Sequence, residues 1–380
     1  MKSGNIRVGI IGLGFIGKVH AQAYHSVPFS YAEPNVDVKV AAILRTSTGR
    51  DEELITSLGN PLVTTDSETF YAQNLDVVDI CTPNFLHLEQ ARTAATHGCH
   101  IYMEKPLGWN LEHAQKIANA AKEAAILSHT AFTKRYYPAV QEAKAILEAG
   151  LIGEILNFNV HYYHNSYMDP KRPISWRLKH APSGGGAMAD LGVHIIDMTR
   201  YLLGEAAWAS CHTRTFIKER PKTGGSSTME KVDVDDWGVC TIGMRSGAIG
   251  IIEATRFSGG IGDSNRMEIF GSRGSIVIDL KAPLHCIYYD QNKKSRHVGE
   301  LDPSLMKNSK RHFWPAAKMS MGSFLDAHTA CIYDLLQCVK QNQVSMTNFT
   351  DAVKTQEILE AAYLSAAKDS QKISFPIGDN

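Results

Sequence analysis

Short apolar runs alternate with amphipathic stretches along the first third of the chain. The runs have the length and β-branched content of buried strands, and they predict strands at residues 6–11, 39–44, 77–81, 100–103 and 126–131, with a short strand or a loop at residues 61–65. The stretches between them predict helices, the first followed by a Pro-containing loop at residues 26–37. Strands that alternate with helices indicate a doubly wound, parallel α/β sheet.

The pattern changes near residue 131. After one amphipathic helix at residues 138–149, longer strands separated by turn signals predict a mostly antiparallel sheet, with members at residues 154–163, 206–218, 236–244, 248–255, 266–270, 275–280 and 286–289. Further helices are predicted at residues 186–203, 323–341 and 350–368, and the polar stretch 290–315 is expected to be a mobile loop. We therefore expect an α/β domain over residues 1–131 and an α+β domain with a large, open, mostly antiparallel sheet over residues 132–380.

A glycine motif follows the first strand directly and opens the first helix. It reads Gly12-Leu13-Gly14-Phe15-Ile16-Gly17, which is G-x-G-x-x-G between a strand and a helix. In that setting Gly12 permits a tight turn, Gly14 lets a pyrophosphate approach the backbone, and Gly17 lets the helix pack closely on the strand. The helix start offers N–H groups and partial positive charge to the phosphates. The motif predicts a Rossmann domain that binds a dinucleotide.

The end of the second strand bears on the choice between NAD and NADP. NAD sites commonly place an acidic residue there, on the ribose 2′-OH, but the chain reads Leu44-Arg45-Thr46 instead. Arg45 and Thr46 could hold a 2′-phosphate, which slightly favours NADP. The alternative is that this segment only caps the following helix, since Ser and Thr before Asp51 also suit that role.

Composition narrows the classes of partner. The 380 residues include 39 Lys plus Arg and 39 Asp plus Glu, so the formal net charge is zero and favours neither nucleic acid nor an anionic membrane. No apolar run is long enough to span a membrane. Seven scattered cysteines without C-x-x-C spacing suit reduced thiols and a cytoplasmic location.

Polar residues stand at the ends of several predicted strands. Gly12, Arg45, Thr82 and Glu104-Lys105 all occupy carboxyl ends, where doubly wound sheets bind ligands, so we expect them to line one crevice. Lys105 could hydrogen-bond a substrate hydroxyl or relay its proton if burial or a nearby cation lowers its pKa. The alternative is a solvated surface lysine before a helix-starting proline.

A second group of candidates lies on the helix predicted after three glycines, Gly184 to Gly186. Asp190 and His194 are four residues apart and are expected on one helical face, with Asp197 near it. A carboxylate beside an imidazole suits general acid/base work, although a structural pair has the same pattern. A metal site would need a third ligand, and none stands at a diagnostic spacing. We therefore predict no metal.

Two basic segments complete the candidates. Trp176-Arg177 could close over a nicotinamide or bind substrate oxygens, and a Trp packed on an Arg stem is the alternative. Arg135 lies in Lys134-Arg135-Tyr136-Tyr137, at the predicted domain boundary, where it could contact substrate or belong to a charged linker.

These motifs together resemble the glucose–fructose oxidoreductase / inositol dehydrogenase / MocA (Gfo/Idh/MocA) family over essentially the whole chain. They are GLGFIG, DICTPNFLH at residues 79–87, EKP at residues 104–106 and GGGAMADLGVHIIDMTRYLLG at residues 184–204. The second half, with WR before the glycines, ERP at 219–221, VDVDD at 232–236 and EATR at 253–256, looks nearest to levoglucosan-type sugar dehydrogenases.

The resemblance implies hydride transfer between a carbinol carbon and C4 of a nicotinamide. It places Lys105, Asp190 and His194 on the family's catalytic trio, with the histidine as acid/base and the lysine polarising the substrate oxygen. A further set falls on cofactor-contact positions, namely Thr82, Pro83, Asn84, His87 and Glu104. It also implies a homodimer or homotetramer through the second sheet.

The sequence thus predicts an NAD(P)-dependent dehydrogenase acting on a secondary hydroxyl of a sugar, anhydrosugar or inositol. One alternative is an NAD-dependent glycosidase of the same fold, which oxidises C3 transiently and eliminates the aglycone. Another is a non-catalytic nucleotide-binding regulator. Such regulators tend to lose the lysine or the histidine, and both Lys105 and His194 are present. Thr133 stands where many members have Asn, which affects the substrate contacts expected near Arg135.

Overall fold

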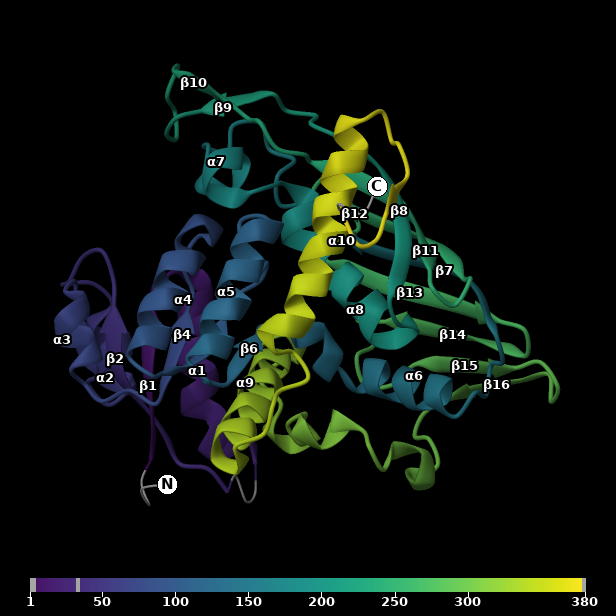
Figure 1. The fold of residues 1–380 in the computed structure, drawn as a ribbon, viewed down its shortest axis with the longest axis horizontal. Coiled ribbons are helices and arrows are strands. Elements are labelled where there is room, and N and C mark those ends of the chain that lie inside the picture. The colour runs from purple at the N-terminus through teal and green to yellow at the C-terminus, as the bar shows by residue number, and fades with distance from the viewer. Residues whose placement is uncertain (1–4, 32–34, 378–380) are drawn as a thin grey trace. The chain divides into compact units, whose positions relative to one another are not determined.

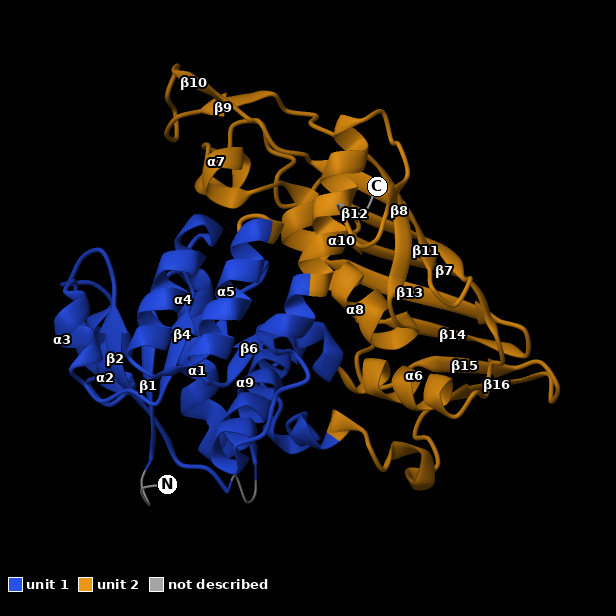
Figure 2. Cartoon of the chain, in the orientation of Figure 1, with its two compact units in different colours: residues 1–108, 112–136, 312–353 blue, residues 109–111, 137–311, 354–380 orange. Residues whose placement is uncertain are grey.

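Two compact units make up the protein, and the computed structural model describes residues 5–31 and 35–377 (Figure 2). Unit 1 holds residues 1–108, 112–136 and 312–353; unit 2 holds residues 109–111, 137–311 and 354–380. The chain thus passes into unit 2 after Tyr136, close to the boundary predicted at residue 131. Residues 312–353, which the sequence placed with the second domain, group with unit 1.

Unit 1 is built on a six-stranded parallel sheet in the order β3-β2-β1-β4-β5-β6. Its strands are β1 (Ile6–Ile11), β2 (Val38–Leu44), β3 (Leu62–Thr64), β4 (Val77–Ile80), β5 (His100–Met103) and β6 (Ser128–Thr130). The order reverses between β1 and β4, which is the switch point where such sheets bind ligands. The predicted doubly wound α/β fold is confirmed.

Most helices of this unit directly follow one of its strands along the chain (Figure 1). They are α1 (Phe15–Ser30), α2 (Glu52–Ser57), α3 (Ser67–Tyr71), α4 (His87–Thr96), α5 (Leu111–Glu123) and α9 (Ser323–Gln341). The prediction that a loop starts at residue 26 was wrong, because α1 continues through Pro28 to Ser30. An interior proline costs a helix about 3 kcal/mol, but Tyr24 and Val27 are fully buried and their packing holds this turn.

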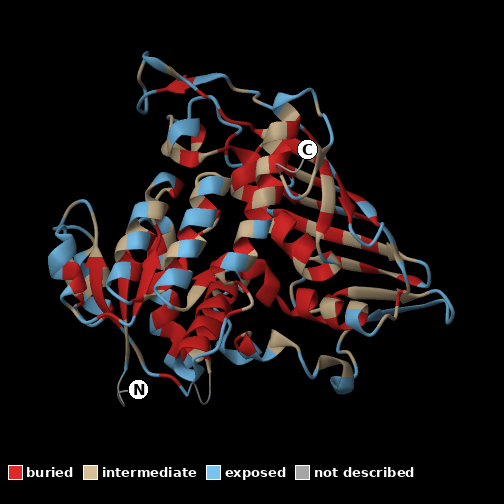
Figure 3. Cartoon of the chain, in the orientation of Figure 1, coloured by how far each residue is buried: buried red, intermediate tan, exposed pale blue. Residues whose placement is uncertain are grey.

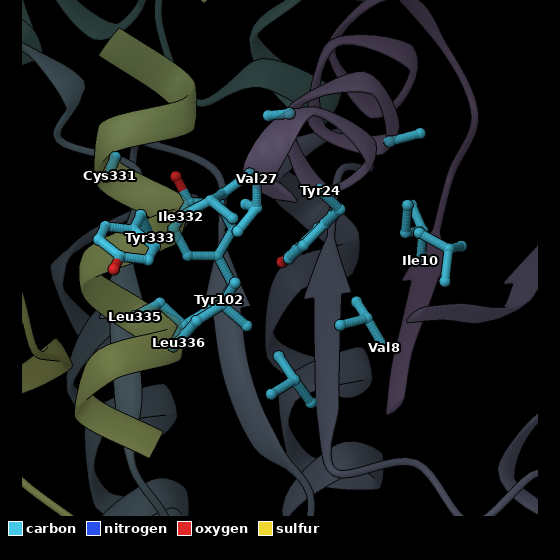
Figure 4. Close-up of a cluster of buried hydrophobic side chains, with 14 of the residues drawn as sticks. Val8, Ile10, Tyr24, Val27, Tyr102, Cys331, Ile332, Tyr333, Leu335 and Leu336 are labelled. Carbon is cyan, nitrogen blue, oxygen red and sulfur yellow. The ribbon is translucent and has the colours of Figure 1, made fainter. Parts of the chain in front are cut away.

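The core of unit 1 joins segments that are far apart in the sequence. Side chains of β1 and α1, such as Val8, Tyr24 and Val27, meet Ile332 and Leu336 from α9 (Figure 4). Helix α9 is buried along most of its length (Figure 3). A helix that is apolar on more than one side needs cover all round, so α9 is an integral part of the dinucleotide-binding fold.

Unit 2 is built on a nine-stranded sheet in the order β16-β15-β14-β13-β7-β12-β11-β8-β17. Its strands are β7 (Ile155–Tyr163), β8 (Ala206–Arg214), β11 (Trp237–Met244), β12 (Ile249–Thr255), β13 (Ser264–Gly271), β14 (Gly274–Asp279), β15 (Ile287–Asp290), β16 (Ser295–Val298) and β17 (Ile373–Ser374). Neighbouring strands are antiparallel except for β7 and β12. The mostly antiparallel sheet is therefore confirmed.

Helices lie against one face of this sheet, where α6 packs on β14 and α8 on β7 (Figure 1). The helices of unit 2 are α6 (Pro138–Glu148), α7 (His180–Ser183) and α8 (Val193–Leu203), together with most of α10 (Phe349–Ala367). On the other face, alternate residues of β12 such as Ile249 and Ile251 remain exposed. Among the described helices, none is both long and apolar enough to cross a membrane.

Some elements of unit 2 differ from the prediction. The short strands β9 (Glu219–Pro221), β10 (Met229–Lys231), β16 and β17 were not predicted, because two to four residues carry too little periodicity. Stretch 290–315, expected to be a mobile loop, contains β16 and two 3₁₀ turns, at Pro303–Met306 and Lys310–Phe313. The helix predicted at residues 186–203 is split into a π-helical turn, Met188–Gly192, and α8.

Candidate functional site

The glycine turn after β1 has the shape that a pyrophosphate requires. Gly12 has a φ of +92°, in the region that favours glycine. A Cβ on Gly17 would lie 2.0 Å from the Gly12 oxygen, so only glycine fits there. A Cβ on Gly14 would meet no described heavy atom within 4 Å, and no described side chain caps α1. The backbone around Gly14 and the positive end of α1 thus fit the dinucleotide, with Phe15 (74% exposed) and Ile16 in the first turn.

An acidic residue does reach the end of β2, although it is not adjacent to the strand in sequence. Asp51 Oδ2 lies 3.1 Å from Arg45 Nη2, and Asp51 Oδ1 lies 2.6 Å from Nζ of Lys18. The hydrogen bond from Lys18, with a smaller contribution from Arg45, lowers the pKa of Asp51. Arg45 is thus neutralised by a local carboxylate, while Thr46 is exposed.

The loop after β4 is tied to the loop after β5 through one imidazole. His87 is fully buried, with Nε2 3.0 Å from the Thr82 oxygen and Nδ1 3.2 Å from the Leu107 oxygen. Burial lowers the pKa of His87, although both carbonyls favour the charged ring. Pro83 and Asn84 lie in the loop that this bridge holds, and Asn84 is buried.

Glu104 is held by His20, a buried histidine of α1. His20 Nε2 lies 3.2 Å from Glu104 Oε1, and His20 Nδ1 lies 3.0 Å from Asp79 Oδ2. Burial alone would lower the pKa of His20, but Asp79 raises it well above its ordinary value. Burial alone would likewise raise the pKa of Glu104, but His20 and Lys105 bring it down to about 2. His20 is therefore a buried imidazolium between two carboxylates.

This network reaches the predicted catalytic lysine through its backbone. Glu104 Oε2 accepts a hydrogen bond from the Lys105 N–H at 3.1 Å, and the Lys105 side chain is half-buried. The peptide bond between Lys105 and Pro106 is cis. The alternative of a fully solvated surface lysine does not describe this residue.

The groups around His20 also include residue types that bind metals. Cys81 Sγ lies 3.1 Å from both His20 and Asp79, and His328 adds a second imidazole near Glu104. Metals bind the neutral imidazole, the thiolate and the carboxylate. His20 is protonated, and burial raises the pKa of the Cys81 thiol. The distances are those of hydrogen bonds, and the absence of a metal stays a prediction.

Arg135 lies in a buried 3₁₀ turn, Thr133–Tyr136, rather than in a solvated linker. Its Nη1 donates to the Met346 oxygen at 2.8 Å, and its Nη2 lies 2.5 Å from Asp351 Oδ2. The guanidinium therefore joins segments within unit 1, and contact with substrate stays a prediction.

In unit 2 the three glycines lead into the π-helical turn that carries Asp190. Asp235 accepts hydrogen bonds from the N–H groups of Gly186 and Met188, each at 2.8 Å, and from the hydroxyl of Tyr363 at 2.8 Å. A Cβ on Gly186 would lie 1.9 Å from the backbone carbonyl oxygen of Asp235, so this close approach requires glycine. The motif Val232–Asp236 thus anchors the start of the turn.

Asp190 and His194 both remain partly accessible. Asp190 Oδ2 lies 3.1 Å from Arg256 Nη2, and 27% of the Asp190 side chain is exposed. The half-buried His194 ring meets Tyr162 edge-on, with ring centroids 6.0 Å apart. Asp197, expected near the same face, is buried and accepts a hydrogen bond from Thr355 at 3.3 Å. Asp197 therefore lies in the interior of unit 2.

Trp176 and Arg177 form a 3₁₀ turn, Trp176–Leu178, just before the glycines. The Arg177 guanidinium lies 4.4 Å from the Trp176 ring centroid, which is a cation–π contact. Both residues are half-buried. The packing expected as the alternative is therefore present, and contact with cofactor or substrate stays a prediction.

Four residues that support the candidates were not singled out from the sequence, namely His20, Asp51, Asp235 and Arg256. Each contacts a residue that is distant in the sequence or that stands at a spacing no motif predicts. The only signal for His20 was its place one helical turn after Gly17. Asp235 and Arg256 stood in motifs noted for resemblance alone.

Known proteins match both halves of the chain. A family profile described as "Oxidoreductase family, NAD-binding Rossmann fold" matches residues 6–132, and one described as "GFO/IDH/MocA C-terminal domain" matches residues 140–277. Levoglucosan dehydrogenase of Pseudarthrobacter phenanthrenivorans is 32% identical over 96% of this chain and 97% of its own length. The scyllo-inositol 2-dehydrogenase (NAD(+)) of Bacillus subtilis is 32% identical over 72% of this chain and 73% of its own.

Solved structures agree with these sequence matches. Levoglucosan dehydrogenase in complex with NADH and L-sorbose superposes with a TM-score of 0.90 and 32% identity, covering 98% of this chain and 99% of that one. The complex with NADH and levoglucosan gives 0.88 and 31%, covering 98% and 100%. Since profiles match both halves and one relative matches nearly the whole length, the chain belongs to the Gfo/Idh/MocA family of oxidoreductases, with an NAD-binding Rossmann domain.

Proposed function

We propose that this protein is an NAD(P)-dependent dehydrogenase that oxidises a secondary hydroxyl of a sugar, anhydrosugar or inositol. The observation that supports this most is the match over nearly the whole chain to a levoglucosan dehydrogenase. Relatives with shorter matches are named as inositol dehydrogenases, which act on a similar ring of secondary hydroxyls. The chain also keeps a lysine, an aspartate and a histidine at the positions that the family resemblance makes catalytic.

The proposed roles follow from the chemistry of these three side chains. A bound nicotinamide supplies the acceptor for the hydride that leaves the carbinol carbon as the ketone forms. His194 accepts the hydroxyl proton, and its partial exposure keeps the ring accessible. Lys105 donates a hydrogen bond to the substrate oxygen from a backbone that Glu104 fixes. Asp190 orients the reacting groups as a carboxylate held by Arg256.

Residues proposed to contact the cofactor lie at the carboxyl ends of the unit 1 strands. The glycine turn would take the pyrophosphate, and the loops after β4 and β5 would approach the nicotinamide side, with Thr82, Pro83, Asn84, His87 and Glu104. Trp176, Arg177 and Arg135 complete the proposed contacts with cofactor and substrate.

Use of NADP is the finer part of the cofactor proposal. Arg45 and Lys18 carry the positive charge that a 2′-phosphate needs, which supports the slight preference inferred from the sequence. Asp51 occupies both cations, and that supports NAD. Initial rates with NAD⁺ and NADP⁺ at matched concentrations would decide between them.

We also propose that the protein is a cytoplasmic homodimer or homotetramer that assembles through the sheet of unit 2. Ile249 is 49% and Ile251 45% exposed on the face of β12 opposite the helices, and exposed apolar side chains at this place would be buried by a second copy. All seven cysteines are buried, as suits reduced thiols in a reducing compartment. Light scattering of wild type and an Ile251→Lys variant would test the assembly.

The test of the main proposal is an assay with levoglucosan, myo-inositol and scyllo-inositol, each with NAD⁺ and NADP⁺. We expect stoichiometric reduced cofactor and ketone with at least one of these ring polyols. The glycosidase alternative predicts cleavage of a glycoside without release of reduced cofactor, and the relatives' names do not favour it. A binding-only regulator predicts tight cofactor binding with no turnover of any such substrate.

A further inference from the structure

We propose that Arg256 is a positioning residue for catalysis, because it holds the carboxylate of Asp190 in one orientation on the π-helical turn. This inference rests on the proposed function, in which Asp190 takes part in turnover. Arg256 belongs to no glycine motif and to none of the candidate positions derived from the sequence.

Arg256 is fixed from its backbone to the tip of its side chain. It follows the last residue of β12, and its N–H donates to the Asp236 oxygen at 3.0 Å. Its side chain is 1% exposed. The guanidinium lies 4.7 Å from the Tyr167 ring centroid, and Nη1 reaches the Arg177 oxygen at 3.4 Å. These contacts hold the guanidinium in one place, so it acts as a fixed anchor for the Asp190 carboxylate.

The contacts of Arg256 converge on Asp190 by two routes. Nη2 lies 3.1 Å from Asp190 Oδ2 and also donates to the Gly186 oxygen at 3.1 Å. The same Gly186 oxygen accepts the N–H of Asp190 at 2.9 Å. The main chain of Asp190, through the Gly186 oxygen, and its side chain are therefore both held by the Arg256 guanidinium. A π turn is a less regular backbone than an α-helix, so a carboxylate carried on it gains more from an external anchor.

Electrostatics also supports this arrangement. Burial by itself would lower the pKa of Arg256, but Asp190, together with smaller contributions from Tyr167, Asp235 and Tyr363, raises that pKa above its ordinary value. The guanidinium therefore stays charged at every working pH and remains a hydrogen-bond donor to Asp190. This suits an orienting role for Asp190 and leaves the proton transfer to His194.

The chain contains a matched control for a purely structural arginine. Arg220 is also fully buried, and its guanidinium lies 5.9 Å from the same Tyr167 ring. It donates to the oxygens of Tyr167 and Asp169. Replacing Arg220 should therefore disturb the same part of unit 2 while leaving the bond between Arg256 and Asp190 in place.

The experiment compares R256K, R256Q, R220K, D190N and the double variant R256K/D190N in the full-length enzyme with its oxidised cofactor. We expect R256K to lower kcat by roughly 10- to 100-fold, because small misplacements of reacting groups cost that much. KM for the cofactor should change little. R220K should keep kcat within about twofold, whatever its effect on the midpoint of thermal unfolding.

The double variant separates positioning from a general loss of structure. If Arg256 acts through Asp190, R256K/D190N should have about the same kcat as D190N, because the second change removes nothing more. Multiplied losses would overturn the inference while leaving the proposed function intact. R256K or R256Q, whichever folds with a native-like thermal transition, would also overturn it by keeping wild-type kcat. Full turnover by D190N would instead refute the role of Asp190 in the proposed function, and the inference with it.

Discussion

The two units support their candidate catalytic residues in different ways. In unit 1 the buried ion pair of His20 and Glu104 holds Lys105 by its backbone N–H. In unit 2 the buried guanidinium of Arg256 holds the side-chain carboxylate of Asp190 directly. The first arrangement fixes the backbone of Lys105, and the second fixes the side-chain carboxylate of Asp190.

The difference has an energetic consequence. The carboxylates around His20 are almost fully buried, so water cannot replace the imidazolium if it is removed. Asp190 is partly exposed, so water can solvate it when Arg256 is shortened. Loss of the support in unit 1 should therefore reduce stability most, and loss of the support in unit 2 should reduce kcat most.

The largest effect should come from the candidate residues themselves. We expect K105M and H194N each to lower kcat by roughly 10³-fold, since each removes a group that contacts the reacting oxygen or its proton. Cofactor affinity, measured by fluorescence titration, should stay near wild type. Exposed residues of the same types supply the controls, K116M and H25Q, which should keep full activity. Undiminished turnover of K105M or H194N would contradict the assigned role.

The next effect tests the support in unit 1. Replacing His20 by Gln leaves Asp79 and Glu104 without their cation in a buried site, which should lower the free energy of unfolding by about 3–5 kcal/mol. Urea unfolding followed by tryptophan fluorescence measures this change. H25Q, at an exposed site on the same helix, should change it by less than about 0.5 kcal/mol. A small effect of H20Q would mean that the buried pair is not needed for stability.

The acid side of the stability curve should report on His328. Burial first, and then the positive charge of His20, lowers the pKa of His328 to about 3, against 6.5 when unfolded. Between these values the unfolded chain binds a proton that the folded chain does not, so stability falls as pH falls from about 6.5 to 3. The slope from one group is at most about 1.4 kcal/mol per pH unit.

Other groups around His328 contribute outside most of that window. His20 has a raised pKa, so the stability that it contributes is complete below 6.5 and is lost as pH rises beyond it. The lowered pKa of Glu104, about 2, adds a loss only below about 4.5. Thermal unfolding at stepped pH should therefore show a shallower fall between pH 6.5 and 4.5 in H328N than in wild type. Identical slopes would contradict the neutral state of His328.

The smallest effect concerns the cofactor. D51N removes the charge that neutralises Arg45 and Lys18, so it should raise kcat/KM for NADP⁺ relative to NAD⁺ by roughly tenfold. The neighbouring exposed Glu52 supplies a control, because E52Q removes one charge from the same loop without freeing either cation. An unchanged ratio in D51N would show that Asp51 does not govern the choice of cofactor.

Much of the fold could be read from local pattern. The strand and helix around Gly12 to Gly17 were predicted because an apolar run, a glycine spacing and a helical period coincide within twelve residues. Helix α9 was predicted at its observed bounds for a similar reason. Its place in unit 1 could not be predicted, because periodicity says which face of a helix is apolar and not which sheet will cover it.

The candidate site divides along the same line. By itself the sequence determined the Rossmann fold, the family, and the residue types able to carry the reaction, since glycine spacing and motif order are local properties. Only the tertiary structure decided what supports them. His20 meets Glu104, Asp51 meets Lys18, and Arg256 meets Asp190 because folding brings distant segments together. Burial then strengthens the pairings of His20 and Arg256, and the neighbours of a charged residue along the chain reveal neither its contacts nor its burial.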